Sequence, residues 1–295
     1  MFPAEFDYFR ATTVDEALAL LDANPEAELL AGGHSLLPTM KLGLASPPAV
    51  VDISGIDALS GVEVDGEVAR VGALTRYVTL ADDAALERAS PAVTAAAAAI
   101  GDVQVRNRGT IGGNLAHADP ASDLPAAVLA SDATLVLVGP DGERTVPADD
   151  FFLAIFTTAK EEGELLARVE LPVLGEESVG VYVKKPSPSS GYAVVGVAAV
   201  LGFEDGVVTN ARVAANGAFD HATRLPGTED ALVDESLDDG VIETAAAAAM
   251  DGLDESALMA DHHVSADYRA ELLRAYTARA LTQAAERADT PVAAD

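Results

Sequence analysis

The sequence predicts an α+β protein with more than one domain, and three observations lead to this prediction. The chain has 295 residues, which is too long for one small core and fits two or three modest domains. Hydrophobic residues make up 49 % of the chain, so a sizeable core can be buried. The pattern of expected elements also changes along the chain, from mixed strands and helices to strands followed by helices.

The N-terminal unit has the pattern of a small β-α-β piece. Thr13 and Glu16 match a capping box, and the apolar residues of TVDEALALL then form one helical stripe. Residues 28–31, ELLA, and residues 49–53, AVVDI, are expected to be short strands. The first of these strands runs directly into a glycine pair, AGGHS.

The second unit combines hairpins with a helix. Residues 62–74, VEVDGEVARVGAL, predict a hairpin that turns at Asp65-Gly66. Ser90 is expected to cap a helix that has Pro91 at its first position and continues through the alanines. The other expected elements are a hairpin over residues 133–146 that turns at Asp141-Gly142 and a strand over residues 165–171.

The third unit begins after GEES, residues 175–178, which we interpret as a boundary. Residues 179–218 predict strands, with a hairpin that turns at Asp205-Gly206. Helical periodicity follows over residues 239–250 and 265–287. The three units together give the α+β class.

The charge of the chain limits its partners. It has 48 acidic and 18 basic residues and a formal net charge of -30. Such a field repels nucleic acid and anionic membrane surfaces, so neither is an expected partner. The scattered acidic residues and the few lysines suggest an acidic surface kept in solution by high salt. A halophilic source is our hypothesis from this pattern.

Absent residues and motifs exclude several classes of site. The chain has no cysteine, which excludes disulfides and cysteine-ligated iron–sulfur clusters within it. It has no G-x-G-x-x-G, Walker A or H-E-x-x-H motif. We interpret the pair His262-His263 as surface histidines and expect no metal site. The N-terminal residues do not match a secretory signal, and no apolar run is long enough for a bilayer. A soluble, cytoplasmic protein without membrane insertion is the expectation.

Two glycine segments carry the chemistry that the sequence reveals. They are AGGHS, residues 31–35, and GTIGGN, residues 109–114. Consecutive small residues let a ligand approach the backbone, and successive amides can form a nest for an anion. Neither segment contains a lysine, so phosphate binding would depend on backbone amides. Each segment alone is more often an ordinary turn, but two of them indicate a long ligand with phosphate near its middle.

These residues resemble a known family. AGGHSLLPTMK and QVRNRGTIGGNLAHADPASDLPA are similar to the FAD-binding medium subunit of the molybdenum hydroxylases, most of all to that of aerobic carbon monoxide dehydrogenase, in the xanthine dehydrogenase family. The resemblance covers nearly the whole chain. It implies an FAD-binding domain of the PCMH type over residues 1–175, with subdomains of about 1–57 and 58–175. An α+β C-terminal domain of the carbon monoxide dehydrogenase flavoprotein type would follow over residues 176–295.

The resemblance also implies site residues. Ala31, Gly32, Gly33, His34 and Ser35 would hold the FAD pyrophosphate, and Thr110, Ile111, Gly112, Gly113 and Asn114 would form the opposite wall. Asp123 would bond the ribityl or ribose part. Lys184 and Tyr192 would approach the flavin ring from the C-terminal domain. His34 is expected to contribute only its backbone, and Tyr192 could equally be a half-buried strand residue.

The implied function is electron transfer rather than acid–base chemistry, so no catalytic residue is assigned. The chain would be the FAD-binding oxidoreductase subunit of a molybdenum hydroxylase. It would receive electrons from 2Fe–2S clusters on a small subunit, with a molybdopterin-binding large subunit also present, as a dimer of heterotrimers. Two alternatives stay open: a stand-alone FAD-dependent oxidoreductase and a non-enzymatic interaction module.

Overall fold

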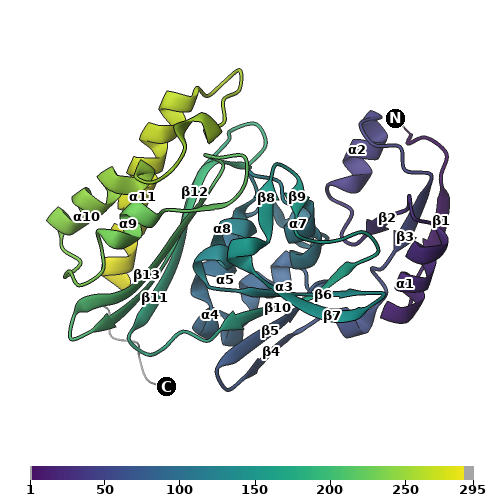
Figure 1. Cartoon of the computed structure of the whole chain (residues 1–295), viewed down its shortest axis with the longest axis horizontal. Coiled ribbons are helices and arrows are strands. Elements are labelled where there is room, and N and C mark those ends of the chain that lie inside the picture. Colours follow the sequence, from purple (N-terminus) through teal and green to yellow (C-terminus); the bar gives the residue numbers. More distant parts are fainter. Residues whose placement is uncertain (1, 289–295) are drawn as a thin grey trace.

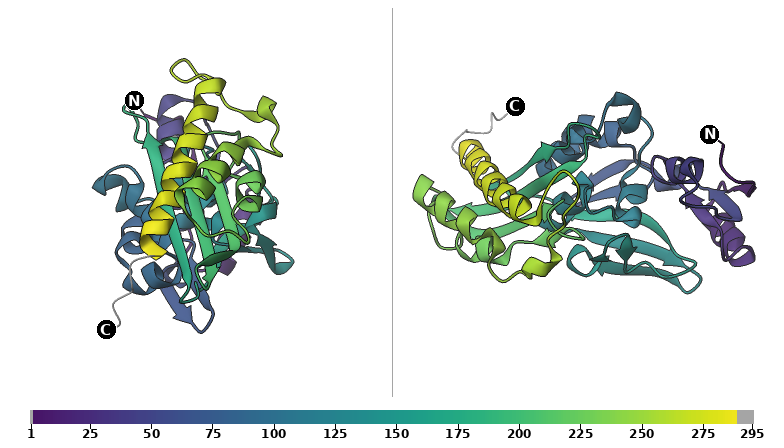
Figure 2. Two further views of the ribbon diagram at one scale, coloured as in Figure 1. Left: turned by 90° about the vertical axis from the view of Figure 1, so that its left-hand side faces the viewer. Right: turned by 90° about the horizontal axis from the view of Figure 1, so that it is seen from above.

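The protein consists of three units arranged in a row, and the computed structural model describes residues 2–288. Figure 1 shows the N-terminal unit at one end, a mixed middle unit and a C-terminal unit at the other end. Seen from above in Figure 2, the N-terminal unit stands apart from the bulk of the molecule. Three clusters of buried hydrophobic residues correspond to this arrangement. The α+β class expected from the sequence is confirmed.

The N-terminal unit is a three-stranded parallel sheet with helices. The strand order is β1-β3-β2. Its elements are β1 (Asp7–Arg10), α1 (Val14–Ala23), β2 (Glu28–Leu30), α2 (Leu36–Leu42) and β3 (Ala49–Asp52). Thr13 caps α1 through its side chain, which accepts from the Glu16 amide at 3.1 Å, while the Glu16 carboxylate accepts from Thr12. The expected β-α-β piece is therefore present, with β1 as an added edge strand that the sequence pattern did not indicate.

The middle unit is a five-stranded antiparallel sheet covered by helices. The strand order is β4-β5-β10-β6-β7. Its strands are β4 (Val62–Asp65), β5 (Val68–Gly72), β6 (Thr134–Gly139), β7 (Gly142–Pro147) and β10 (Leu165–Pro172), with a small hairpin of β8 (Phe152–Ala154) and β9 (Thr157–Thr158). Its helices are α3 (Tyr77–Asp82), α4 (Ala84–Ala89), α5 (Pro91–Ala99), α6 (Val103–Arg106), α7 (Ile111–His117) and α8 (Asp123–Ala130).

The predicted helix start at Ser90 is correct, but the predicted cap is wrong. Pro91 is the first residue of α5, as expected, yet the Ser90 hydroxyl does not bond the helix amides. It donates instead to the Ser131 hydroxyl at 3.2 Å. The buried Ser90 hydroxyl thus finds its hydrogen-bond partner at Ser131, the residue that follows helix α8, rather than at the amides of α5.

The C-terminal unit is a four-stranded antiparallel sheet with helices on one face. The strand order is β11-β12-β13-β14. Its elements are β11 (Ser178–Pro186), β12 (Ala193–Glu204), β13 (Val207–Asn216), β14 (Thr223–Arg224), α9 (Pro226–Asp230), α10 (Asp239–Ala247) and α11 (Ala266–Ala288). The other face of the sheet packs on the middle unit, since Tyr182, Ala198 and Ala214 belong to the middle hydrophobic cluster. The helices and the middle unit thus lie on opposite faces of this sheet (Figure 1).

The hairpin turns illustrate how far a local pattern reaches. Asp205 and Gly206 form the predicted two-residue turn and both have positive φ, at 52° and 80°, as a type I′ turn requires. In the first two hairpins the turn lies one residue away from the predicted pair, at Gly66-Glu67 and Pro140-Asp141.

Within residues 2–288, no helix has both the length and the apolar character that a bilayer crossing requires.

Candidate functional site

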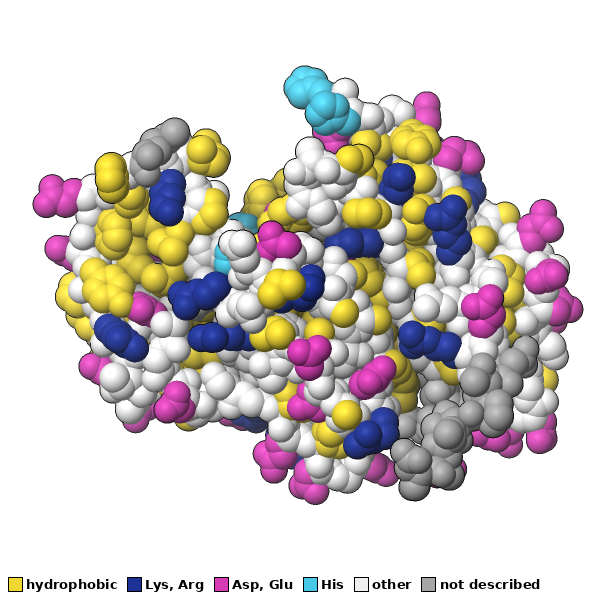
Figure 3. Space-filling model, turned by 180° about the vertical axis from the view of Figure 1, so that it is seen from behind, with side chains coloured by type: hydrophobic (Ala, Val, Ile, Leu, Met, Phe, Trp, Pro, Cys, Tyr) yellow, Lys and Arg dark blue, Asp and Glu magenta, His cyan; other side chains and the backbone are white. Residues whose placement is uncertain are grey.

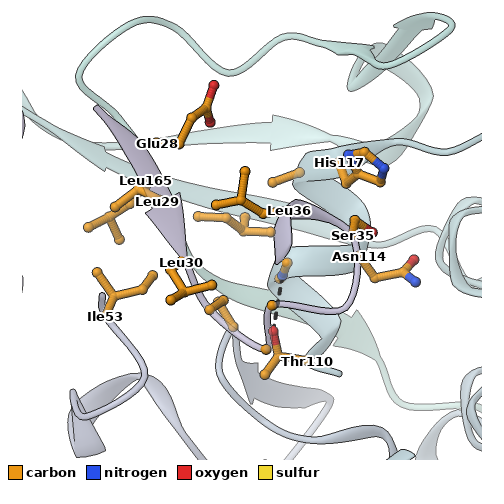
Figure 4. Close-up of a pocket in the computed structure, with 18 of the residues that line it drawn as sticks. Glu28, Leu29, Leu30, Ser35, Leu36, Ile53, Thr110, Asn114, His117 and Leu165 are labelled. Atoms are coloured by element: carbon orange, nitrogen blue, oxygen red, sulfur yellow. Dashed lines mark hydrogen bonds between the residues drawn. The ribbon is translucent and has the colours of Figure 1, made fainter. Parts of the chain in front are cut away.

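A large cavity lies between the N-terminal and middle units. Its volume is about 1080 Å³. Figure 4 shows its walls: β2 and the start of α2 on one side, and α7 with the start of β10 on the other. One end is mainly apolar, with Leu29, Ile53 and Leu165, and the Glu28 side chain also lines the cavity there. The other end carries polar groups, among them Ser35, Asn114 and His117. A long ligand with an apolar and a polar part fits this shape.

The two glycine segments meet at the cavity. A Cβ atom added to Gly32 would overlap the carbonyl oxygen of Arg108 and lie 2.9 Å from the Cα of Gly109. Likewise, a Cβ on Gly109 would overlap the ring of Tyr77, and one on Gly112 would overlap Ala73. These glycines are therefore required because backbones from two units approach closely, and not only because a ligand does.

The first glycine segment presents unused backbone donors. Gly33 has a φ of +74°, which lets the chain turn from β2 into α2. Within residues 2–288, the amides of Gly32, Gly33, His34 and Ser35 donate no hydrogen bond to the protein. The Ser35 hydroxyl also makes none, although Ser35 occupies the N-cap position of α2. Four consecutive free donors beside a cavity form a cradle for an anion.

The second glycine segment is different, because it is neither a turn nor a nest of free amides. Residues 111–117 form helix α7, and Gly112 and Gly113 do not have positive φ. The amides are also in use: Ile111 donates to the Thr75 carbonyl, Gly112 to the Ala73 carbonyl, and Gly113 to the Thr110 hydroxyl (Figure 4). This segment cannot act as a second amide nest, because its consecutive amides from Ile111 to Asn114 are already paired.

The side chains of the second segment shape the wall instead. Gly113 is exposed to the cavity, and a Cβ there would meet only the Thr110 hydroxyl at 2.9 Å and the Ala31 Cβ at 3.4 Å. Ile111 is fully buried in the middle core, so its side chain is not available to a ligand. Asn114 lines the cavity but already bonds Tyr77 and Ser122, at 2.9 and 2.8 Å.

Asp123 and Lys184 lie beside the site and bond each other. The Lys184 ammonium donates to Asp123 at 2.9 Å and to the Gly191 carbonyl at 2.9 Å. The Tyr182 hydroxyl donates to the other carboxylate oxygen of Asp123 at 2.5 Å. Burial raises the pKa of Asp123 to about 6, although Lys184 and Tyr182 both favour the ionised form. Asp123 thus joins α8 of the middle unit to β11 of the C-terminal unit.

Tyr192 reaches the cavity from the loop between β11 and β12. It lines both the large cavity and an adjoining one of about 180 Å³, and its side chain is 43 % exposed. Burial, and then the carboxylates of Asp119 and Asp123, raise its pKa, so its hydroxyl remains a donor at neutral pH. The smaller cavity also contacts His34, Asn114 and Asp123. All three units therefore contribute to one connected site.

Several lining residues were not identified from the sequence. Tyr77 lines both cavities, and burial raises its pKa. The rings of His117 and Phe156 stack with centroids 5.0 Å apart at the cavity wall. His117 lies seven residues, or two helical turns, after Thr110. A prediction of helix for the second segment would therefore have placed His117 on the same face as Thr110, toward the cavity. No local signal marks Phe156, which comes from the β8–β9 hairpin.

Comparison with known proteins decides the family. Residues 4–174 match the model described as the FAD binding domain in molybdopterin dehydrogenase, and residues 181–284 match the CO dehydrogenase flavoprotein C-terminal domain. The chain belongs to the family of FAD-binding medium subunits of molybdenum hydroxylases. As a family member it is an oxidoreductase subunit with FAD as its cofactor.

Individual relatives agree along the full chain. The carbon monoxide dehydrogenase medium chain of Hydrogenophaga pseudoflava is 37 % identical over 285 residues, covering 96 % of this chain and 98 % of that protein. The glyceraldehyde dehydrogenase medium chain of Sulfolobus acidocaldarius is 35 % identical, with 97 % and 100 % covered.

Solved structures agree as well. The Hydrogenophaga pseudoflava carbon monoxide dehydrogenase that lacks the Mo-pyranopterin moiety matches with a TM-score of 0.93 at 37 % identity, covering 97 % of this chain and 99 % of that one. Quinoline 2-oxidoreductase of Pseudomonas putida 86 matches with a TM-score of 0.91 at 31 % identity, covering 98 % and 100 %.

Proposed function

We propose that this medium subunit binds FAD across the cavity and passes electrons from 2Fe–2S clusters on a partner subunit to an external acceptor. The observation that carries the proposal is the run of free amides from Gly32 to Ser35 beside a cavity of about 1080 Å³. A pyrophosphate in the middle of a dinucleotide would accept from these amides. The bound flavin supplies the exchange between one-electron and two-electron carriers.

The residues of the chain position and shield the cofactor. We propose Ala31, Gly32, Gly33, His34 and Ser35 as the phosphate cradle, and Thr110, Ile111, Gly112, Gly113 and Asn114 as the opposite wall. In this wall the helix contributes a flat backbone surface rather than amide donors. Tyr192 would cover the ring from the C-terminal unit. Asp123 would contact the cofactor from the wall of the smaller cavity. Lys184 lines neither cavity and would act on the cofactor only through its ion pair with Asp123.

The assembly is also part of the proposal. Three relatives are named as the medium chain of a dehydrogenase, a subunit of a dehydrogenase complex and the medium subunit of a hydroxylase. We propose a molybdopterin-binding large subunit and a 2Fe–2S small subunit as partners, in a dimer of heterotrimers. We further propose domain limits of 1–175 and 176–295, with a division near residue 57; residues 289–295 lie outside the described residues. A stand-alone oxidoreductase would require a further substrate domain, and each matched family model covers only FAD-domain or C-terminal residues.

Gly113→Val tests the site. A valine side chain would extend from the exposed backbone of α7 into the cavity, so we expect the purified chain to lose most of its flavin absorbance at unchanged secondary structure. Gly240→Val is the matched control, because Gly240 is also exposed in the first turn of a helix, α10, and lies outside the cavity. Normal flavin content in Gly113→Val, or equal loss in the control, contradicts the placement.

A further inference from the structure

Tyr77 is a buried tyrosine whose ring is held in place by the second glycine segment. It is the first residue of α3 and is 6 % exposed. Its amide donates to the Gly109 carbonyl at 3.1 Å, and its ring packs so closely on Gly109 that a Cβ atom there would overlap the ring. Tyr77 also lines both the large cavity and the smaller one. The phenol is therefore fixed where the two cavities adjoin.

A chain of side-chain hydrogen bonds determines the direction in which the Tyr77 hydroxyl can donate. The Ser122 hydroxyl donates to the amide oxygen of Asn114 at 2.8 Å, and the amide nitrogen of Asn114 donates to the Tyr77 hydroxyl oxygen at 2.9 Å. An amide nitrogen donates hydrogen bonds and does not accept them. Asn114 therefore cannot take the Tyr77 proton, which must point toward another acceptor.

The Tyr77 proton has no acceptor in the part of the chain that the structure describes. Among residues 2–288, the Tyr77 hydroxyl only accepts, from Asn114. Buried hydroxyl groups normally donate as well, because a buried donor without a partner costs free energy. Burial raises the pKa of Tyr77, so the phenol keeps its proton at neutral pH. A buried, protonated and unused donor at a cavity is suited to a ligand.

The smaller cavity is the part of the site that suits an aromatic ring beside Tyr77. Ile100 and Val105 give this cavity an apolar wall, and Tyr192 lines it from the C-terminal unit. It adjoins the large cavity at the phosphate cradle, since Ser35 lines both. A dinucleotide with its pyrophosphate in the cradle would extend one of its rings here. Figure 3 shows the hollow between the N-terminal unit and the rest of the molecule, where the site opens.

We propose that the Tyr77 hydroxyl donates a hydrogen bond to the polar edge of the flavin ring and thereby raises the reduction potential of bound FAD. This inference rests on the proposed function, because it requires FAD in the site. Reduction at neutral pH adds two electrons, which the 2Fe–2S subunit supplies, and one proton from solvent, so the ring gains one negative charge. A hydrogen bond to an ionised acceptor is about twice as strong as one to a neutral acceptor. The Tyr77 hydroxyl would therefore stabilise the reduced ring more than the oxidised ring.

Tyr77→Phe tests the proposal, because it removes the hydroxyl and keeps the ring that packs on Gly109. We would measure the Kd of the full FAD-free chain for oxidised FAD by fluorescence titration, and the reduction potential of bound FAD by equilibration with a redox dye. We expect the Kd for oxidised FAD to rise about fivefold and that for reduced FAD about tenfold more, which lowers the potential by about 30 mV. Tyr276→Phe is the matched control and should change neither quantity, because Tyr276 is also buried, at 8 % exposed, and lies outside both cavities.

Each failure has its own result. An unmodified chain that cannot be reconstituted with FAD refutes the proposed function and this inference with it. If FAD binds and Tyr77→Phe changes neither the Kd nor the potential, Tyr77 is not a donor to the cofactor, and the proposed function stands. If the Kd rises at an unchanged potential, the hydroxyl donates to the ribityl or phosphate part, which overturns its assignment to the ring.

Ser122→Ala carries the test if Tyr77→Phe does not fold. Without the Ser122 hydroxyl, the Asn114 amide can rotate so that its oxygen accepts the Tyr77 proton. The hydroxyl is then no longer reserved for the cofactor. We expect the potential of bound FAD to fall in the same direction as in Tyr77→Phe but by less, and an unchanged potential in Ser122→Ala would overturn the proposal.

Discussion

The ion pair between Asp123 and Lys184 links the middle and C-terminal units, and removing one of its members should destabilise the chain. The two side chains are 5 % and 10 % exposed, so solvent screens the interaction little. Asp123→Ala removes the carboxylate that accepts from Lys184 at 2.9 Å and from Tyr182 at 2.5 Å. It leaves the Lys184 ammonium nearly buried with only the Gly191 carbonyl as a partner.

The magnitude follows from the charge left behind. Removing one member of a buried ion pair costs about 3–5 kcal/mol, because the remaining charge stays desolvated without compensation. The pair itself contributes much less relative to two apolar residues of similar size. Asp123→Ala/Lys184→Met should therefore be at least ~1 kcal/mol more stable than Asp123→Ala alone, since the double variant has no orphan charge.

Urea unfolding at pH 7, followed by far-UV circular dichroism on FAD-free protein, measures these free energies without a contribution from cofactor binding. Glu271→Ala is the control: it breaks the ion pair with Arg274, whose side chains are 73 % and 40 % exposed, and should change the free energy by less than about 0.5 kcal/mol. A loss below about 1 kcal/mol in Asp123→Ala, or no recovery in the double variant, would refute the reasoning.

Three other outcomes are expected. Burial raises the folded-state pKa of Asp123 from 3.8 to about 6, so between these pH values the folded chain holds a proton at Asp123 that the unfolded chain releases. The free energy of unfolding of the unmodified chain, relative to that of Asp123→Asn, should therefore fall from about pH 4 to 6, by at most ~1.4 kcal/mol per pH unit. A rise over this range would contradict the prediction. Gly32→Val should lower the free energy of unfolding by at least about 1–3 kcal/mol and abolish FAD retention, because a Cβ at this position overlaps the Arg108 carbonyl. Gly175→Val is the control and should do neither, since a Cβ at that position would have no neighbour closer than 3.6 Å. The melting temperature should rise with KCl up to molar levels if the charge of -30 reflects a halophilic source, and a fall removes that hypothesis.

Local patterns predicted elements whose residues determine their own conformation. The turn at Asp205-Gly206 and the long helix α11 belong to this group, since positive φ and helical periodicity are properties of short segments. Helix α7 was missed because two glycines within it have poor helix propensity. Tertiary contact overrides that propensity: Gly112 must lack a side chain to pack on Ala73, and Thr110 provides the cap.

The parts of the site that consist of one continuous segment could be predicted from the sequence, whereas contacts between residues distant in sequence could not. The first glycine segment has the free amides that its residues suggested. The ion pair of Asp123 could not be predicted from the sequence, because Lys184 lies 61 residues away and no local pattern indicates that the two side chains are in contact. The same holds for Gly32 and Arg108, whose contact joins two units. Distant contacts of this kind decide which polar groups remain available to a ligand.

The contact between the glycine segments has a consequence for the life of the protein in the cell. The cradle belongs to the unit around one hydrophobic cluster and the opposite wall to the unit around another, so any molecule held between them also fastens the N-terminal unit in place. A ligand at 100 times its Kd stabilises the bound form by about 2.7 kcal/mol. With FAD bound there as we propose, a chain without flavin would lack this added stability, so we expect its N-terminal unit to be cleaved faster by proteases than that of the FAD-loaded chain.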